Sequence, residues 1–163
     1  MRARWLLCLA ALALPAATAG AQSTPPAQTQ AQALFEDLIV KDTRTTAAVR
    51  ALLQSDAGFV GAQPTFGDLT GDGRMDAVVQ VRMPGAAGTV GVFVFSSDGT
   101  RANRLRAVLR SQALYRATTR IDAGPTLTIT QPKWATGDAL CCPADRTERK
   151  YAWNARTHTL TRR

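Results

Sequence analysis

The order of apolar and polar residues divides the chain into a helical first part and a strand-rich remainder. In the first part apolar residues recur every three or four positions, which places them on one face of a helix. They are Leu34, Phe35, Leu38 and Ile39 in a first segment, and Val49, Leu52 and Leu53 in a second. The sequence therefore predicts two amphipathic helices. The second should run from Thr45 or Thr46 to Leu53, with a threonine at 43, 45 or 46 as its cap.

From Thr65 onward apolar residues recur at every second position, and turn residues interrupt them at short intervals. The predicted strands lie near Ala77–Arg82, Thr89–Phe95, Arg104–Arg110, Tyr115–Asp122, Pro125–Thr130, Glu148–Asn154 and Thr157–Arg162. Turn chemistry separates them at Pro84-Gly85, Asp98-Gly99, Ala123-Gly124 and Asn154-Ala155. Because short connections join antiparallel neighbours, we expect an α+β fold. N-terminal helices should pack on an antiparallel β-meander sheet of about six or seven strands.

Two of the predicted strands should differ in how they are covered. Val90–Phe95 is apolar on both faces, which is typical of a central strand that is covered on both sides. In the segment Arg104–Arg110, Leu105, Ala107 and Leu109 alternate with mostly charged residues. That strand should therefore turn its second face mostly toward water.

Residues 1–21 have the composition of a secretory signal peptide. Two arginines precede an apolar run from Trp5 to Ala17, and the small residues Ala19 to Ala21 form a cleavage site. The apolar run is too short to span a bilayer, and Cys8 comes too early in it for a lipid anchor. We expect a soluble protein that is exported to the periplasm or the medium, with no transmembrane segment in the remainder.

The 142 residues that follow the cleavage site suffice for one domain with its own core. Residues 22–32 are rich in alanine and glutamine and contain two prolines, so we expect a flexible tether there. Residues 33–163 should then form a single α+β domain.

Positive charge gathers in the second half of the chain. The whole sequence has 20 Lys and Arg against 12 Asp and Glu. Residues 22–100 hold 5 basic and 8 acidic side chains, whereas residues 101–163 hold 13 basic and 4 acidic ones. A basic sheet favours anionic partners such as a cell-envelope polymer. More commonly, however, the arginines of such a strand only form a solvent-exposed face without a partner. Nucleic acid is not the expected partner, because the arginines alternate with threonine and not with aromatic residues on which bases stack.

The most specific motif lies between Phe66 and Val81, where oxygen-bearing residues follow the spacing D-x-T-x-D-G-x-x-D. This spacing suits a hard cation, because calcium takes about six to eight oxygen ligands from carboxylates, carbonyls and water. Gly73 should turn the chain with a positive φ. The predicted ligands of Ca²⁺ are Asp68, Thr70, Asp72, the backbone carbonyl of Arg74, and Asp76.

Calcium binding at this loop should be weak. Val79 stands where an EF-hand has its bidentate glutamate, and threonine is a weak ligand, so we expect a dissociation constant of about 10⁻⁴–10⁻³ M. The alternative is a hairpin without metal, because Gly-Asp-Gly is favourable turn chemistry. Three carboxylates in so short a loop repel one another unless a counter-ion lies between them, which favours the cation.

The segment GDLTGDGRMDAVV, residues 67–79, resembles the calcium loops of FG-GAP/VCBS repeats, integrin propeller blades and dockerins. One copy is present, which excludes a propeller or a solenoid. Together with GVFVF, GDALCCP (Gly137 to Pro143) and YAW (Tyr151 to Trp153), it also resembles small secreted bacterial proteins of the LppP/LprE lipoprotein type. That resemblance implies the fold and an exported location, and it implies no enzymatic reaction.

Cys141 and Cys142 are the cysteines that remain after signal cleavage. Adjacent Cα atoms lie about 3.8 Å apart across a trans peptide, below the usual disulfide range of about 4.4–6.8 Å. A vicinal disulfide, which we expect in an oxidising compartment, would therefore be strained and easy to reduce. A redox-active pair or an intermolecular bridge is the alternative. A thiolate metal site would find only His158 as a further soft ligand.

No catalytic constellation stands out in the sequence. His158 is the only histidine and falls in the last predicted strand, where an edge or partly buried side chain is expected. The serines lack the flanking glycines of a nucleophile elbow, and Tyr151, Trp153 and Trp134 fit the core of a C-terminal hairpin. The sequence therefore predicts a secreted, non-enzymatic binding or structural domain stabilised by calcium. The alternatives are a thiol–disulfide redox protein that uses the cysteine pair, and a polyanion-binding module that uses the arginine-rich sheet.

Overall fold

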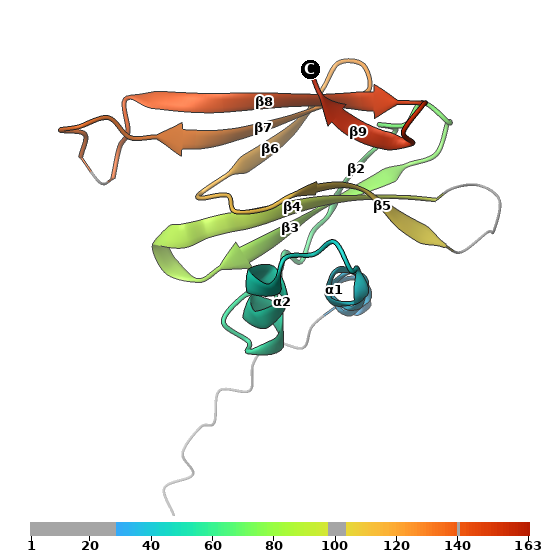
Figure 1. Cartoon of the computed structure of the whole chain (residues 1–163), viewed down its shortest axis with the longest axis horizontal. Coiled ribbons are helices and arrows are strands. Elements are labelled where there is room, and N and C mark those ends of the chain that lie inside the picture. The colour runs from blue at the N-terminus through green and yellow to red at the C-terminus, as the bar shows by residue number, and fades with distance from the viewer. Residues whose placement is uncertain (1–28, 98–103, 140) are drawn as a thin grey trace, which may run out of the picture.

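The computed structural model describes residues 29–97, 104–139 and 141–163. Within them two α-helices, one short 3₁₀ helix and nine β-strands follow one another (Figure 1). The elements are α1 (Gln30–Lys41), α2 (Ala47–Gln54), β1 (Phe59–Val60), β2 (Thr65–Gly67), β3 (Asp76–Met83), η1 (Gly85–Ala87), β4 (Gly88–Ser97), β5 (Leu105–Ser111), β6 (Thr118–Asp122), β7 (Thr126–Lys133), β8 (Asp145–Asn154) and β9 (Thr159–Arg162). The predicted signal peptide, most of the predicted tether and the turn at Asp98-Gly99 lie outside the described residues.

The strands form two antiparallel sheets. The first sheet has the order β1-β3-β4-β5, and β2 also pairs with β3. The second sheet has the order β6-β7-β8-β9. Helices and antiparallel strands agree with the predicted α+β class. The single sheet and the strand number are wrong, because β1 and β2 are too short to show a periodic pattern and the chain leaves the first sheet after β5.

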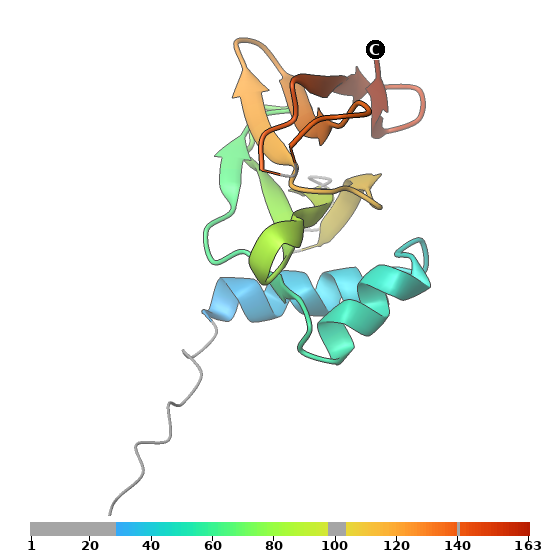
Figure 2. The same ribbon diagram turned by 90° about the vertical axis from the view of Figure 1, so that its left-hand side faces the viewer.

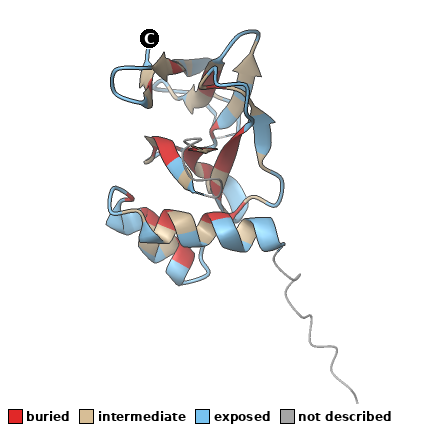
Figure 3. Ribbon diagram, turned by 90° about the vertical axis from the view of Figure 1, so that its right-hand side faces the viewer, coloured by how far each residue is buried: buried red, intermediate tan, exposed pale blue. Residues whose placement is uncertain are grey.

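Two separate apolar cores hold three layers together, with the helices on one face of the first sheet and the second sheet on the other (Figure 2). The core between the helices and the first sheet includes Phe35, Ile39, Leu53, Phe93 and Phe95. The core between the sheets includes Val92, Val94, Leu127, Ile129 and Leu160. Buried residues accordingly concentrate on the inner side of the helices and along the first sheet (Figure 3).

β4 is the central strand of the first sheet, as its apolar pattern predicts. Val92 and Val94 point into the core between the sheets, whereas Phe93 and Phe95 point toward the helices, and all four are at most 2% exposed. Side chains alternate between the faces of a strand, so a strand with a core on each side must be apolar throughout.

β5 departs from its predicted alternation. Leu109 pairs with Val94, but Ala107 pairs with Phe95, so Val108 is an extra residue in a β-bulge. The bulge shifts the alternation of side chains, so residues before and after it no longer share the face that a regular strand would give them. Ala107 therefore lies in the core under the helices, while Leu109 lies in the core between the sheets. The prediction that Leu109 shares a face with Ala107 is wrong for this reason.

Both helices begin at a threonine cap. Thr29 forms a capping box with Gln32, which satisfies two free amides of the first turn of α1. Thr46 is the N-cap of α2, one of the predicted candidates, and its side chain accepts a bond from the amide of Val49. Residues 30–32, expected in the tether, are the first turn of α1. None of the described helices is long and apolar enough to cross a membrane.

Candidate functional site

The loop between β2 and β3 contains the predicted cation ligands, and Asp76 anchors its end. Asp76 is the first residue of β3 and is only 1% exposed. Its Oδ2 atom accepts hydrogen bonds from the backbone amides of Leu69 at 2.7 Å and Thr70 at 2.9 Å. Because a buried carboxylate is tolerated only when hydrogen bonds satisfy it, Asp76 fixes the start of the loop to the strand that follows.

Asp68 closes the middle of the loop in the same way. Its Oδ1 accepts from the amides of Gly71 at 2.7 Å and Asp72 at 3.2 Å, and its Oδ2 accepts from Gly73 at 2.9 Å. Asp72 in turn accepts from the amide of Arg74 at 2.9 Å. Gly71 and Gly73 have φ values of 77° and 80°, so the positive φ expected at Gly73 is confirmed. The aspartates thus hold the loop by binding its own amides.

The fit of this loop to a metal ion is partial. In the part of the chain that the structure describes, no group of three or more His, Cys, Asp or Glu side chains is arranged to hold a metal. However, the Oγ1 atom of Thr70 is buried and has no hydrogen-bond partner among the described residues. Thr70 and Asp72 line a cavity of about 140 Å³ together with Arg106 and His158. Arg106 brings a positive charge that opposes a divalent ion, and calcium binding stays a prediction.

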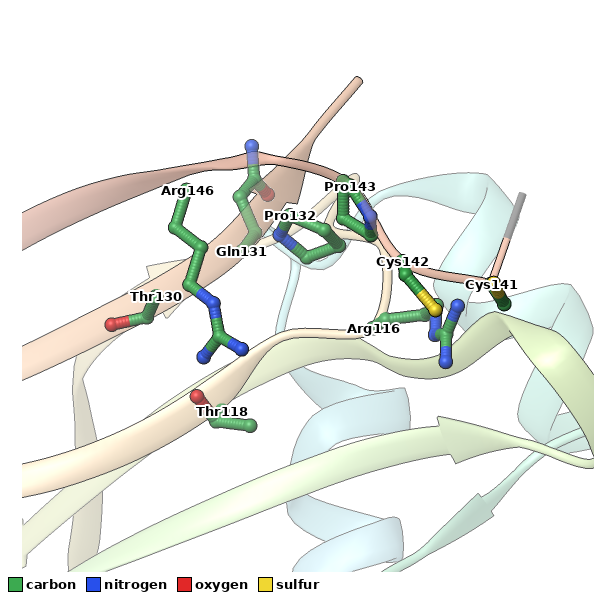
Figure 4. A pocket seen from close by; sticks show the side chains of 9 residues that line it. All are labelled: Arg116, Thr118, Thr130, Gln131, Pro132, Cys141, Cys142, Pro143 and Arg146. Carbon is green, nitrogen blue, oxygen red and sulfur yellow. The ribbon is translucent and has the colours of Figure 1, made fainter. Parts of the chain in front are cut away.

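A second candidate site lies at one end of the second sheet (Figure 4). This arginine pocket has a volume of about 390 Å³ and is lined chiefly by Arg116, Thr118, Thr130, Cys141, Cys142 and Arg146. Thr118 and Thr130 face each other on β6 and β7, and Arg146 belongs to β8. Figure 4 shows the guanidinium of Arg146 extending toward Thr118 and that of Arg116 beside the sulfur of Cys142. Three strands and the β5–β6 and β7–β8 connections therefore bring these groups together.

The two arginines of this pocket have unused hydrogen-bond donors. Neither guanidinium forms a hydrogen bond or an ion pair with a residue that the structure describes, whereas Arg110, Arg120 and Lys133 each pair with an aspartate. A guanidinium presents its donors in a planar fork that matches the two oxygens of a carboxylate or a phosphate. Arg116 and Arg146 are therefore suited to hold an anion between them.

Cys141 and Cys142 are exposed thiols in this structure. A hydrogen bond with Cys141 raises the pKa of Cys142 above its usual value, and desolvation adds to the rise, while the charge of Arg116 opposes it. A raised pKa leaves little thiolate at neutral pH, the reverse of the lowered pKa of reactive cysteines. The vicinal disulfide and the redox use of this pair both stay predictions.

A wider hollow, the aromatic groove, adjoins the arginine pocket. It has a volume of about 620 Å³, contains Tyr115 and Trp134, and shares Arg116, Gln131 and Pro132 with the arginine pocket. The rings of Tyr115 and Trp134 meet edge to face with centroids 5.3 Å apart. Trp134 thus belongs to this groove and not to the core of the C-terminal hairpin, where it was predicted.

His158 lies in the turn between β8 and β9, because β9 begins only at Thr159. Its φ is 51°, and its ring meets Trp153 edge on with centroids 6.2 Å apart. Among the described residues no serine hydroxyl or carboxylate forms a hydrogen bond with the imidazole. His158 is thus exposed in a turn and is not the edge or partly buried strand residue expected from the sequence.

Sequence reasoning did not single out Tyr115, Arg116 and Arg146 as site residues. They come from the β5–β6 connection and from β8, so no local spacing links them. The one available signal was the excess of basic side chains in residues 101–163, which does not tell paired arginines from unpaired ones.

No family model, curated protein or solved structure matches this chain. The fold and the two sites define its class as a three-layer α+β domain with an aspartate-rich turn between β2 and β3 and an arginine-lined pocket. The resemblance to FG-GAP/VCBS loops and to LppP/LprE lipoproteins rests on the sequence motifs alone.

Proposed function

We propose that this protein is an exported, non-enzymatic binding domain that holds an anionic ligand in the arginine pocket. This proposal is supported by the observation that Arg116 and Arg146 reach one cavity from different elements. Neither guanidinium has a hydrogen-bond or ion-pair partner within the described chain. A phosphate or carboxylate would complete their hydrogen bonding, and the hydroxyls of Thr118 and Thr130 add donors. Export rests on the signal sequence in residues 1–21, and it makes an anionic polymer of the cell envelope the fitting partner.

Binding suits this pocket better than catalysis does. Arginine and threonine are poor proton acceptors at neutral pH, so they position a ligand and do not activate a nucleophile. The raised pKa of Cys142 keeps its thiol protonated. His158 lines the cavity beside the loop and not the arginine pocket, so it cannot serve the cysteines as a base.

Calorimetric titration with inorganic tripolyphosphate, at low and at physiological salt, tests this proposal. The affinity should fall with salt, and Arg116→Gln or Arg146→Gln should each weaken binding about fivefold or more. Arg156→Gln is the matched control, because it removes the same charge from an exposed turn outside the pocket. Equal losses for all three variants would show that binding follows net charge, and no binding by the unaltered protein would refute an anion site.

A second proposal concerns the loop, which we infer binds one calcium ion that pins the β2–β3 hairpin. The specific observation is the buried Oγ1 of Thr70 beside Asp72, which has no hydrogen-bond partner in the part of the chain that the structure describes. A cation that takes this oxygen would satisfy it and would balance the carboxylates of Asp68 and Asp76. The carbonyl of Arg74 would complete the set. The ion would supply stability and take part in no reaction.

Melting temperatures in EDTA and in millimolar calcium test the metal. A ligand that binds only the native state, at a free concentration ten times its dissociation constant, should raise the free energy of unfolding by about 1.4 kcal/mol. Thr70→Val keeps the shape of the side chain and removes the unpartnered hydroxyl. It should not lower the melting temperature in EDTA, and it should reduce the calcium-dependent rise. If calcium does not change the melting temperature, the β2–β3 hairpin binds no calcium.

A further inference from the structure

We infer that the aromatic groove and the arginine pocket are two parts of one binding site and that the ligand is an anionic saccharide. A sugar ring would rest against Tyr115 and Trp134, while its acid group would pair with Arg116 and Arg146. This inference rests on the proposed anion site and adds the requirement that the ligand contain a sugar ring.

The two hollows adjoin each other. Arg116, Gln131 and Pro132 line both of them, so the guanidinium of Arg116 borders the aromatic groove as well as the arginine pocket. Their volumes, about 620 and about 390 Å³, lie in the range of small-molecule sites. A ligand that fills both must be longer than a free phosphate and must carry an apolar surface at one end and a negative charge at the other.

The segment that presents Tyr115 is held in an unfavourable backbone conformation. Ala113 and Arg116, on either side of Tyr115, have φ values of 57° and 48°. Residues other than glycine rarely adopt such φ values, because each costs about 1–3 kcal/mol. Residues with this kind of backbone strain cluster at ligand sites. Between these two residues Tyr115 is 43% exposed, and its ring lines the groove.

Packing on both sides of Tyr115 maintains this conformation. Leu114 and Ala117 are each 5% exposed and belong to the core between the sheets. The amide of Leu114 donates to the carbonyl of Val90, and that of Arg116 donates to the carbonyl of Ala87, both at 2.9 Å. The segment is therefore fixed to β4 and η1, and it presents Tyr115 and Arg116 as a rigid pair.

The polar groups of the groove favour a ligand with hydroxyls. The Oε1 of Gln131 and the Nε1 of Trp134 lie below the surface of the groove and have no hydrogen-bond partner among the described residues, so a ligand hydroxyl would reach either atom only after a shift of its side chain. One is an acceptor and the other a donor, and a hydroxyl can serve either. A saccharide combines such hydroxyls with an apolar ring face for Tyr115, whereas an inorganic anion offers no ring and an apolar ligand leaves the arginines unpaired.

Three probes separate the parts of this site: tetragalacturonate, neutral maltotetraose and inorganic tripolyphosphate. Tetragalacturonate should bind more tightly than maltotetraose. Tyr115→Ala should weaken tetragalacturonate about tenfold, which corresponds to one contact worth about 1.4 kcal/mol, and should leave tripolyphosphate unchanged. Phe66→Ala is the matched control, because Phe66 is a 53% exposed aromatic residue outside the groove. It should affect no probe.

The outcomes distinguish this inference from the proposed anion site. If Arg146→Gln weakens tetragalacturonate and Tyr115→Ala does not, the arginine pocket stands and the aromatic groove is no part of it. If neither tetragalacturonate nor tripolyphosphate binds, the anion site fails and the saccharide with it. If an acidic, proline-containing peptide of equal charge binds more tightly and depends more on Tyr115, the groove holds a peptide. Thermal melting of Tyr115→Ala verifies that the variant folds.

Discussion

Arg110 on β5 and Asp42 at the end of α1 form the ion pair that fixes the helical layer to the first sheet. The Nε of Arg110 lies 2.5 Å from the Oδ2 of Asp42, and the two side chains are only 12% and 14% exposed. Asp42 also accepts a hydrogen bond from the amide of Arg44 at 3.0 Å. Partial burial and a charged donor make such a pair stronger than an exposed one.

Because of this ion pair, the stability of the protein should depend on pH in the acidic range. Burial raises the pKa of Asp42, but the hydrogen bonds from Arg44 and Arg110 outweigh it, so the pKa lies below its usual 3.8. A carboxylate with a lowered folded-state pKa stabilises the protein above its unfolded pKa. That stabilisation is lost as the pH falls through the folded pKa. Asp42→Asn should therefore cost about 2 kcal/mol at neutral pH, with a smaller difference as the pH falls below 3.8.

Urea unfolding across this pH range measures the effect. Asp37→Asn is the control, since its ion pair with Lys41 is exposed on both sides and should contribute about 0.5 kcal/mol at most. A cost for Asp42→Asn that is the same at all pH values would contradict the titration of this carboxyl.

Asp76→Asn should destabilise the protein even in EDTA. The substitution keeps the size of the buried side chain but replaces a charged acceptor of two amide bonds with a neutral amide. The expected loss is about 1.5–3 kcal/mol, the contribution of hydrogen bonds to a charged group. Differential scanning calorimetry in EDTA measures it, with exposed Asp72→Asn as the mild comparison. Destabilisation seen only in calcium would mean that Asp76 acts through a metal and not through the loop amides.

Gly88→Ala should disturb the connection that carries Arg116. Gly88 has φ 58°, which strains a residue with a Cβ, and its Cβ position lies at ordinary contact distance, 3.4 Å, from the Cα of Arg116, so that relief of the strain would move the backbone beside Arg116. The expected loss is about 2 kcal/mol, together with weaker binding of tripolyphosphate. Gly85→Ala is the control, because Gly85 also has positive φ, 72°, but nothing lies within 4 Å of its Cβ position. It should lower stability without changing binding, and equal effects of the two variants on binding would argue against the contact.

Cys141→Ala should lower the pKa of Cys142. The hydrogen bond between the two thiols is the largest cause of the raised pKa, and the charge of Arg116 already acts in the opposite direction. Removing Cys141 should therefore move the pH midpoint of Cys142 alkylation by iodoacetamide to lower pH. Arg116→Gln, made in the same background, should move it back upward. An unchanged midpoint in Cys141→Ala would show that the thiols do not interact in solution.

Local pattern was sufficient for most elements of the fold. The helical spacing located both helices, and the cap Thr46 was among the three candidates. The apolar run Val90–Phe95 identified the central strand, because a core on each side leaves no polar position. The bulge at Val108 was not predictable, since it depends on the register against β4. The division into two sheets also escaped prediction, because sequence periodicity does not tell which strands pair.

The candidate sites were predictable to very different degrees. The loop from Asp68 to Asp76 is contiguous, so its spacing alone identified the turn and the positive φ of Gly73. The arginine pocket joins residues from 116 to 146 through pairing across β6, β7 and β8. The left-handed conformations of Ala113 and Arg116 leave no trace in composition, because neither residue favours them.

The six residues from Gln112 to Ala117 connect the first sheet to the second, and three of them, Ala113, Tyr115 and Arg116, line the groove. Lengthening this passage to reshape the groove would pull Leu114 and Ala117 out of the interior and loosen the sandwich. Within this connection, substitutions that leave the interior unchanged are therefore limited to outward side chains such as those at 115 and 116. A family descended from this fold would diversify by substitution there, while the length of the passage stayed constant.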